Sequence, residues 1–145
     1  MFGTNVMDGT RGVNGMQNYW GVVIDQSLKD QGYIDHLNVV AKRQVGGWGM
    51  LLTSVPADAA PVQIASLQSH MVDISNDCWY AHFFRDDELI IVYQDCTFRM
   101  TIDRLTWNDS IQYGLHHGIP LEQLDFKPCT TVDASTYFGV SVGRR

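Results

Sequence analysis

Several signals that would place this chain in a large class of proteins are missing from its sequence. No apolar run approaches the roughly 20 residues that a membrane-spanning helix requires, so we expect no membrane association. Lysine and arginine total 10 against 16 aspartates and glutamates, which gives a net charge of −6. Because affinity for nucleic acid comes largely from basic side chains, we expect no nucleic-acid partner. The acidic balance is compatible with a cationic ligand or a basic protein partner, although solubility alone also explains it.

Cysteine is scarce, and its spacing excludes two common uses. Cys78, Cys96 and Cys129 form no CxxC pair and no metal-ligand spacing. An odd number of cysteines without a signal peptide indicates reduced thiols, so we expect a cytoplasmic protein. Since no two ligand-type residues share a chelating offset, we also predict that the protein holds no metal.

Motifs for nucleophilic and phosphate chemistry are missing as well. The chain has no GxSxG turn around a serine nucleophile, and no cysteine lies in a recognisable Cys–His signature. Gly46–Gly49 lacks the lysine and the length of a P-loop, and GxGxxG does not occur. The sequence therefore names no catalytic residue and no cofactor, and it leaves open whether the protein is an enzyme.

The clearest pattern that the sequence does contain is the stretch Trp79–Thr101. Its residues alternate in character over three short segments that are separated by two polar turns. Leu89–Tyr93 is almost wholly apolar, which is typical of a central strand covered on both faces. These features predict an antiparallel meander on which the rest of the chain packs.

Three further strands and two helices complete the predicted fold. The strands are expected at Tyr19–Asp25, Leu37–Val45 and Trp48–Val55, and a Gly-Gly dipeptide suits a hairpin turn between the last two. Capping patterns and apolar stripes predict helices at Ala59–Val72 and from Thr106 to about His117. We therefore predict an α+β fold, with a two-layer, mostly antiparallel sheet of about six strands and two helices packed on one face.

Composition divides the chain into three parts. Residues 1–18 are rich in glycine and asparagine and are expected to be a flexible N-terminal extension, with Met16 as an alternative natural start. Residues 19–128 are expected to be a single α+β domain. Residues 129–145 are expected to be a C-terminal tail in which 136–142 alternates and could add an edge strand. Because such an edge invites pairing with a second copy, we predict a homodimer to which the termini contribute.

Aromatic side chains in the predicted strands are the remaining functional signal. Most of them must pack in the core, because burial of a large side chain is what stabilises the fold. Two helices on one face would nevertheless leave several aromatic side chains on an open sheet face or in a pocket there. We predict that this surface binds an apolar or cationic small molecule, or a protein partner, through Trp48, Tyr80, His82, Phe84 and Tyr93.

His82 is the one residue for which catalysis is a specific alternative. It lies in the middle of a predicted strand, where a packed histidine usually bonds its ring nitrogens to nearby backbone or carboxylate groups. It could instead be a general base or a ligand anchor in an aromatic pocket. We predict a non-catalytic binding or interaction module, with a small enzyme that uses His82 with Tyr80 or a carboxylate as the alternative. A purely structural subunit is a third possibility.

Three segments resemble a family of short prokaryotic hypothetical proteins. They are YWGVVI in the first strand, WYAHF in the meander, and 113-YGLHHGIPLEQLDFKP-128, which begins in the second predicted helix and continues beyond it. The resemblance covers about Tyr19–Pro128 and implies a compact domain. No activity or catalytic residue is established for such proteins, so the resemblance implies no function.

Overall fold

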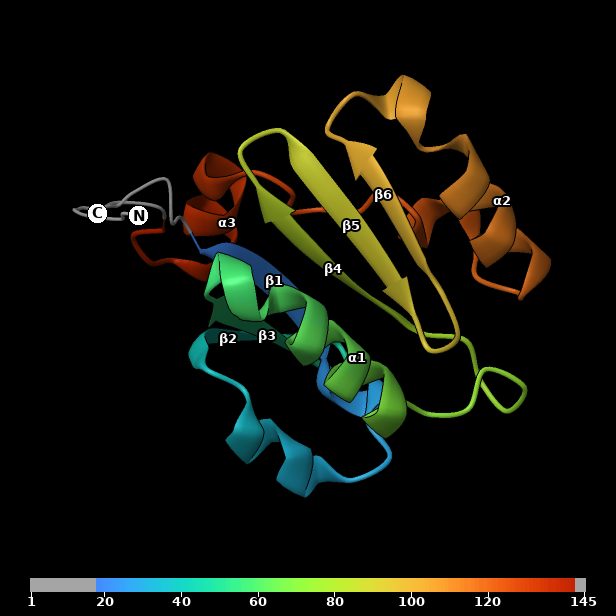
Figure 1. Cartoon of the computed structure of the whole chain (residues 1–145), viewed down its shortest axis with the longest axis horizontal. Helices are drawn as coiled ribbons and strands as arrows, with labels where there is room; N and C mark the ends of the chain where they lie inside the picture. Colours follow the sequence, from blue (N-terminus) through green and yellow to red (C-terminus); the bar gives the residue numbers. More distant parts are fainter. Residues whose placement is uncertain (1–17, 143–145) are drawn as a thin grey trace.

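The computed structural model describes residues 18–142, and its centre is a six-stranded sheet (Figure 1). The strands are β1 (Tyr19–Ile24), β2 (Val39–Val45), β3 (Trp48–Val55), β4 (Tyr80–Arg85), β5 (Glu88–Tyr93) and β6 (Thr97–Thr101). They lie in the order β2-β3-β1-β4-β5-β6, and every neighbouring pair is antiparallel. The predicted α+β class and the mostly antiparallel sheet of about six strands are therefore confirmed.

The register of the meander follows from the alternation in its sequence. Tyr80 lies opposite Tyr93 and His82 lies opposite Ile91 on the neighbouring strand. Ala81 consequently faces one side of the sheet, and His82 faces the other with Phe84. This division of β4 determines which side chains reach the candidate site described below.

Helices cover both faces of the sheet, as Figure 1 shows for the three longest. The helices are α1 (Ala60–His70), α2 (Asn108–His116) and α3 (Thr131–Phe138), and the short 3-10 turns are η1 (Asp25–Ser27), η2 (Gln31–His36), η3 (Ala57–Ala59), η4 (Arg104–Thr106) and η5 (Leu121–Gln123). The layer arrangement differs from the prediction of two helices on one face, because α1 packs on one face and α2 and α3 pack on the other. The apolar character of the central strands on both faces accounts for the difference.

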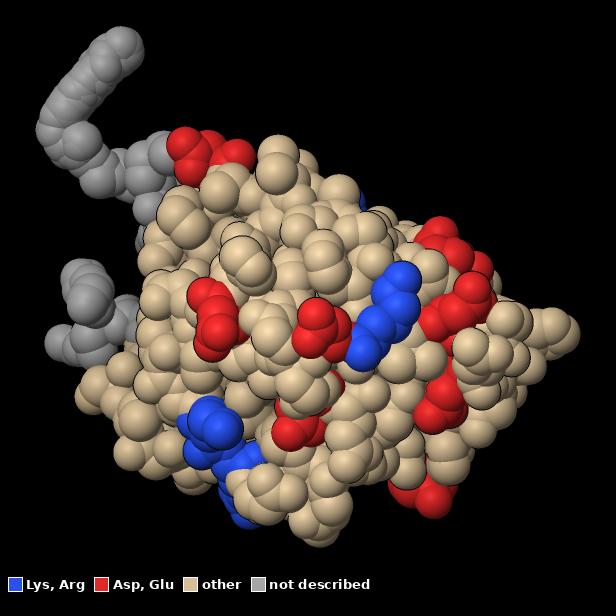
Figure 2. Space-filling model, turned by 90° about the horizontal axis from the view of Figure 1, so that it is seen from below, with Lys and Arg blue, Asp and Glu red and all other residues tan. Residues whose placement is uncertain are grey.

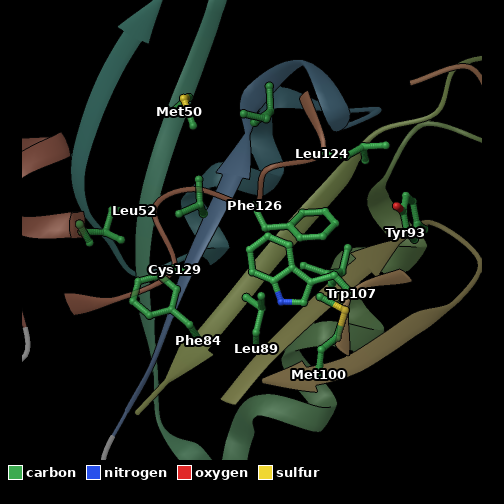
Figure 3. Packing of buried hydrophobic residues seen from close by; sticks show 14 of the residues in the cluster. Met50, Leu52, Phe84, Leu89, Tyr93, Met100, Trp107, Leu124, Phe126 and Cys129 are labelled. Atoms are coloured by element: carbon green, nitrogen blue, oxygen red, sulfur yellow. The ribbon is translucent and has the colours of Figure 1, made fainter. Parts of the chain in front are cut away.

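Each face has its own buried cluster. Under α1 the cluster includes Val23, Leu51, Phe83 and Leu67. Figure 3 shows the cluster on the opposite face, where the indole of Trp107 meets the ring of Phe126 edge to face, with ring centroids 5.2 Å apart. The second cluster draws much of its apolar surface from the segment that follows α2, so residues beyond the sheet complete this core.

The prediction of an edge strand at 136–142 is wrong, because residues 131–138 form α3. The side chain of Thr130 accepts a hydrogen bond from the Asp133 N–H at 3.1 Å, which caps the start of the helix. Gly139 ends the helix in the left-handed conformation, with φ of 70°. Phe138 and Val142 are buried against the sheet, so residues 129–142 belong to the folded domain and not to a separate tail.

Two further predictions concern the flexible N-terminal extension and the absence of a membrane-spanning segment. The predicted flexible extension, apart from Asn18, lies outside the described residues. Within residues 18–142, every helix is too short or too polar to cross a lipid bilayer.

Candidate functional site

A cavity of about 800 Å³ lies on the face of the sheet that carries α2 and α3. Strands β1, β2 and β3, the start of β4, the loop after α2 and one side of α3 form its walls. Its aromatic lining residues are Trp48, Trp79, Tyr80 and Tyr137. The volume lies in the range of about 300–1,000 Å³ that is usual for small-molecule sites in proteins.

On this face, the part of the sheet between α2 and α3 is not covered by a helix. At one end, Tyr113 of α2 packs on Tyr93 and Phe98, with ring centroids 4.8 Å and 5.5 Å apart. At the other end, α3 lies against β2. The chain from His117 to Pro128 crosses between the helices and supplies one wall of the cavity.

His82 is a buried histidine on the cavity wall, with 3% of its surface exposed. Its Nε2 lies 2.7 Å from the carbonyl oxygen of Pro128. Because a carbonyl only accepts, Nε2 carries the hydrogen, and Nδ1 of the neutral ring keeps its lone pair. Burial lowers the pKa of His82 to about 4, although the Pro128 carbonyl and the charge of Asp125 act in the opposite direction. The ring is therefore uncharged near neutral pH.

Tyr80 stands beside His82, with the ring centroids 6.1 Å apart. Its hydroxyl donates a hydrogen bond of 2.5 Å to the carbonyl oxygen of Gln123, and its ring meets Phe126 edge to face at 5.3 Å. Burial, and then the charge of Asp125, raise the pKa of Tyr80. The phenol is therefore protonated near neutral pH and is fixed by its contact with the loop.

The turn around Phe126 places Asp125 on the same wall. Phe126 has φ of 52°, a left-handed conformation that is uncommon for a large side chain, and its ring is fully buried. The half-buried Asp125 precedes it, and the Asp125 carboxylate accepts a hydrogen bond of 3.3 Å from the Lys127 N–H. Strained backbone of this kind persists where surrounding packing holds it, and it is often found at binding sites.

Arg43 and Tyr137 join the last helix to the sheet at the opposite wall. The Arg43 guanidinium lies 4.2 Å from the centre of the Tyr137 ring and donates a hydrogen bond of 3.0 Å to the Tyr137 carbonyl oxygen. The Tyr137 hydroxyl in turn lies 3.0 Å from the sulfur of Met50. These contacts hold α3 against β2 and β3.

Three of the five predicted binding residues line the cavity, namely Trp48, Tyr80 and His82. Trp48 meets Trp79 edge to face, with ring centroids 5.5 Å apart. Phe84 and Tyr93 do not line it, because both side chains are fully buried in the core. The Tyr93 hydroxyl is used there as a donor to the Ser110 carbonyl oxygen at 2.8 Å.

Other lining residues were not singled out in the sequence. Trp79 precedes β4 and packs against both buried clusters, so alternation along the strand does not predict its place in the cavity wall. Tyr137 lies in the segment predicted as an edge strand, and the capping pattern from Thr130 to Asp133 is the sequence signal of the helix that it forms instead. Asp125 lies in the QLDF segment and had no local signal of a binding role.

The candidate metal ligands and the cysteines of the described residues give little support for a metal site or for a nucleophile. Within residues 18–142, no three histidine, cysteine, aspartate or glutamate side chains come together in a way that could hold a metal ion. The cysteines are free thiols, and burial raises the pKa of Cys78, which lines the cavity, to about 11. That thiol is therefore protonated and a poor nucleophile near neutral pH. The site as a whole is a cavity with aromatic side chains in its walls and a few polar side chains held in place by hydrogen bonds.

Comparison with known proteins adds no relative from which a function could be transferred. The similarity to short prokaryotic hypothetical proteins stays a prediction, because no protein-family model, no curated protein and no solved structure matches this chain.

Proposed function

We propose that this protein is a non-catalytic binding protein that takes a small organic molecule with an aromatic or apolar body into the cavity. The observation that carries the proposal is the 800 Å³ space walled by Trp48, Trp79, Tyr80 and Tyr137. Sites for small molecules are typically concave and mostly apolar, with a few polar groups that fix orientation. His82 and Tyr80, each held by a backbone carbonyl, supply such groups.

The same contacts support binding over the catalytic alternative. A general base needs a pKa near the working pH, and His82, with a pKa of about 4, is a weak base near neutrality. Its Nε2 and the Tyr80 hydroxyl both donate to carbonyl oxygens, so neither donor is free to deliver a proton to a substrate. An enzyme that uses His82 with Tyr80 or a carboxylate is therefore the less well supported function.

A small molecule is also better supported than a basic protein partner. A concave cavity suits a compact ligand, whereas protein interfaces usually need a broad surface. On the face drawn in Figure 2, acidic side chains form separate groups with uncharged surface and basic side chains between them.

The three free thiols support a cytoplasmic location, where cysteines stay reduced.

Binding of N-phenyl-1-naphthylamine, an uncharged aromatic dye that fluoresces in apolar surroundings, tests the proposal. We expect a saturable rise in fluorescence with the full chain. Thr136→Trp should weaken dye binding at least about tenfold, because Thr136 lines the cavity from α3 and the indole would occupy the space. Val132→Trp is the matched control, since Val132 lies on the same helix with 74% of its surface exposed.

The control variant Val132→Trp should bind the dye as tightly as the unchanged protein does. The absence of saturable dye binding to the unchanged chain would contradict the proposed function, as would equal loss of binding in both variants.

A further inference from the structure

We propose that the ligand of this cavity is an organic cation, namely a protonated amine attached to an aromatic or apolar body. This inference rests on the proposed function, because it specifies the charge and the hydrogen-bonding character of the molecule that the same cavity takes. Three features of the wall support it: its hydrogen-bond acceptors, its carboxylates and its aromatic faces.

The fixed polar groups beside β4 are acceptors. His82 uses Nε2 as its donor to Pro128, so its Nδ1 can only accept. Tyr80 uses its hydroxyl hydrogen toward Gln123, so the remaining capacity of that oxygen is as an acceptor. The carboxylate of Asp125 adds a charged acceptor from the neighbouring loop. An ammonium group, which only donates, complements all three.

The charged side chains around the cavity also favour a cation. Three carboxylates line it, from Asp77, Asp125 and Asp133, and within residues 18–142 none of them forms an ion pair. Of the arginine and lysine in the lining, Arg43 is already engaged by the ring and the carbonyl of Tyr137. Lys127 is exposed and opposes the preference, but its charge is accessible to solvent and screening.

Asp125 is the carboxylate on which the preference depends most. It is half-buried, whereas Asp77 and Asp133 are exposed, so its field is screened least. Its charge reaches both polar groups of the wall, since it acts on the pKa of Tyr80 and of His82. An ammonium group placed beside these two rings would lie in the same field.

The aromatic wall already holds a cation on one of its rings. The guanidinium of Arg43 stands over the face of Tyr137 in the geometry of a cation–π contact. Trp48 and Trp79 offer further indole rings, which attract cations most strongly among aromatic side chains. His82 is uncharged near neutral pH and adds no repulsion. An anionic ligand would be repelled by the three carboxylates, and of the lining arginine and lysine only the exposed Lys127 is not already engaged by Tyr137.

Calorimetric titration with three compounds that share an indole ring tests the inference. They are tryptamine, tryptophol and indole-3-propionate, which are cationic, neutral and anionic near neutral pH. We expect tryptamine to bind at least about tenfold more tightly than tryptophol, and indole-3-propionate to bind most weakly. Asp125→Asn should weaken tryptamine about tenfold and tryptophol much less, because only the amine is charged. Asp109→Asn on α2, outside the cavity lining, is the matched control and should change neither.

Equal affinities for the three compounds, or tighter binding of the anion, would overturn the inference. Titration of the naphthylamine dye tells the two failures apart. If the dye binds and tryptamine has no advantage, the charge preference is wrong and the binding function stands. If neither the dye nor any indole binds, both proposals are wrong. Should Asp125→Asn fail to fold, the comparison of the three compounds on the unchanged chain still decides the question.

Discussion

At the scale of single residues, His82 should make the stability of the fold depend on pH. Its pKa is about 4 in the folded protein against an ordinary value of 6.5, so the unfolded chain binds the proton more readily. The contribution of His82 to the stability of the fold is therefore fully present above about pH 6.5 and is lost as the pH falls toward 4. The difference corresponds to about 3 kcal/mol in the free energy of unfolding, which urea denaturation at a series of pH values would measure.

Two variants isolate this contribution from that of the carboxylates. His82→Gln should flatten the part of the pH dependence that lies between about pH 6.5 and 4, because the titrating ring is gone. His116→Gln should leave it unchanged, since His116 is exposed at the end of α2. A pH dependence that is the same in His82→Gln as in the unchanged chain would show that His82 is not the buried neutral group described above.

At the scale of elements, Trp107 should anchor α2 to the sheet. It is 3% exposed, its ring contacts Phe126, and its indole N–H donates a hydrogen bond of 2.7 Å to the Thr101 carbonyl oxygen. Trp107→Ala should therefore lower the free energy of unfolding by about 3–5 kcal/mol in denaturant melts. Leu105→Ala is the control, because Leu105 is 90% exposed and its loss should cost no more than about 0.5 kcal/mol. A loss below about 1 kcal/mol for Trp107→Ala would contradict this role.

The elements also show how far local patterns determine the fold. The strands and the first two helices were predicted to within a few residues, because their alternation and caps are local signals. The helix α3 was missed because its apolar residues also fit an alternating pattern over a short stretch. Ala134 and Phe138, four residues apart, are the pair that its buried face actually uses. The cap from Thr130 is the signal that distinguishes the two interpretations.

The cavity could be predicted only in part for the same reason. Trp48, Tyr80 and His82 come from strands whose register follows from alternation, so their common face was accessible to sequence reasoning. Asp125 and Tyr137 reach the cavity from a loop and from the last helix. Their approach to the strands depends on the path of the whole chain, which no local pattern encodes.

At the scale of the whole molecule, the homodimer stays a prediction. The tail strand on which it was based is a helix, but strand β2 lies at one edge of the sheet and exposes 45% of Val40. An edge strand has backbone groups that can pair with a second copy. Light scattering after size exclusion at micromolar concentration should give twice the chain mass of 16.4 kDa.

A charge at this edge gives the matching control for the dimer. Val40→Lys should reduce the measured mass to that of one chain, because lysine on an edge strand opposes pairing. A monomeric mass for the unchanged chain would contradict the dimer. A dimer that persists in Val40→Lys would place the contact on another surface.

Because α3 forms one wall of the cavity, ligand occupancy and the docking of this helix are thermodynamically linked. The helix is held to the sheet by a few contacts of Arg43, Tyr137 and Met50, together with its small buried face. A molecule that binds only when the wall is in place lowers the population of chains in which the helix has locally opened. Amide hydrogen exchange in α3 should therefore slow as ligand fills the cavity. The backbone amides of this helix would then detect a ligand that is bound by side chains.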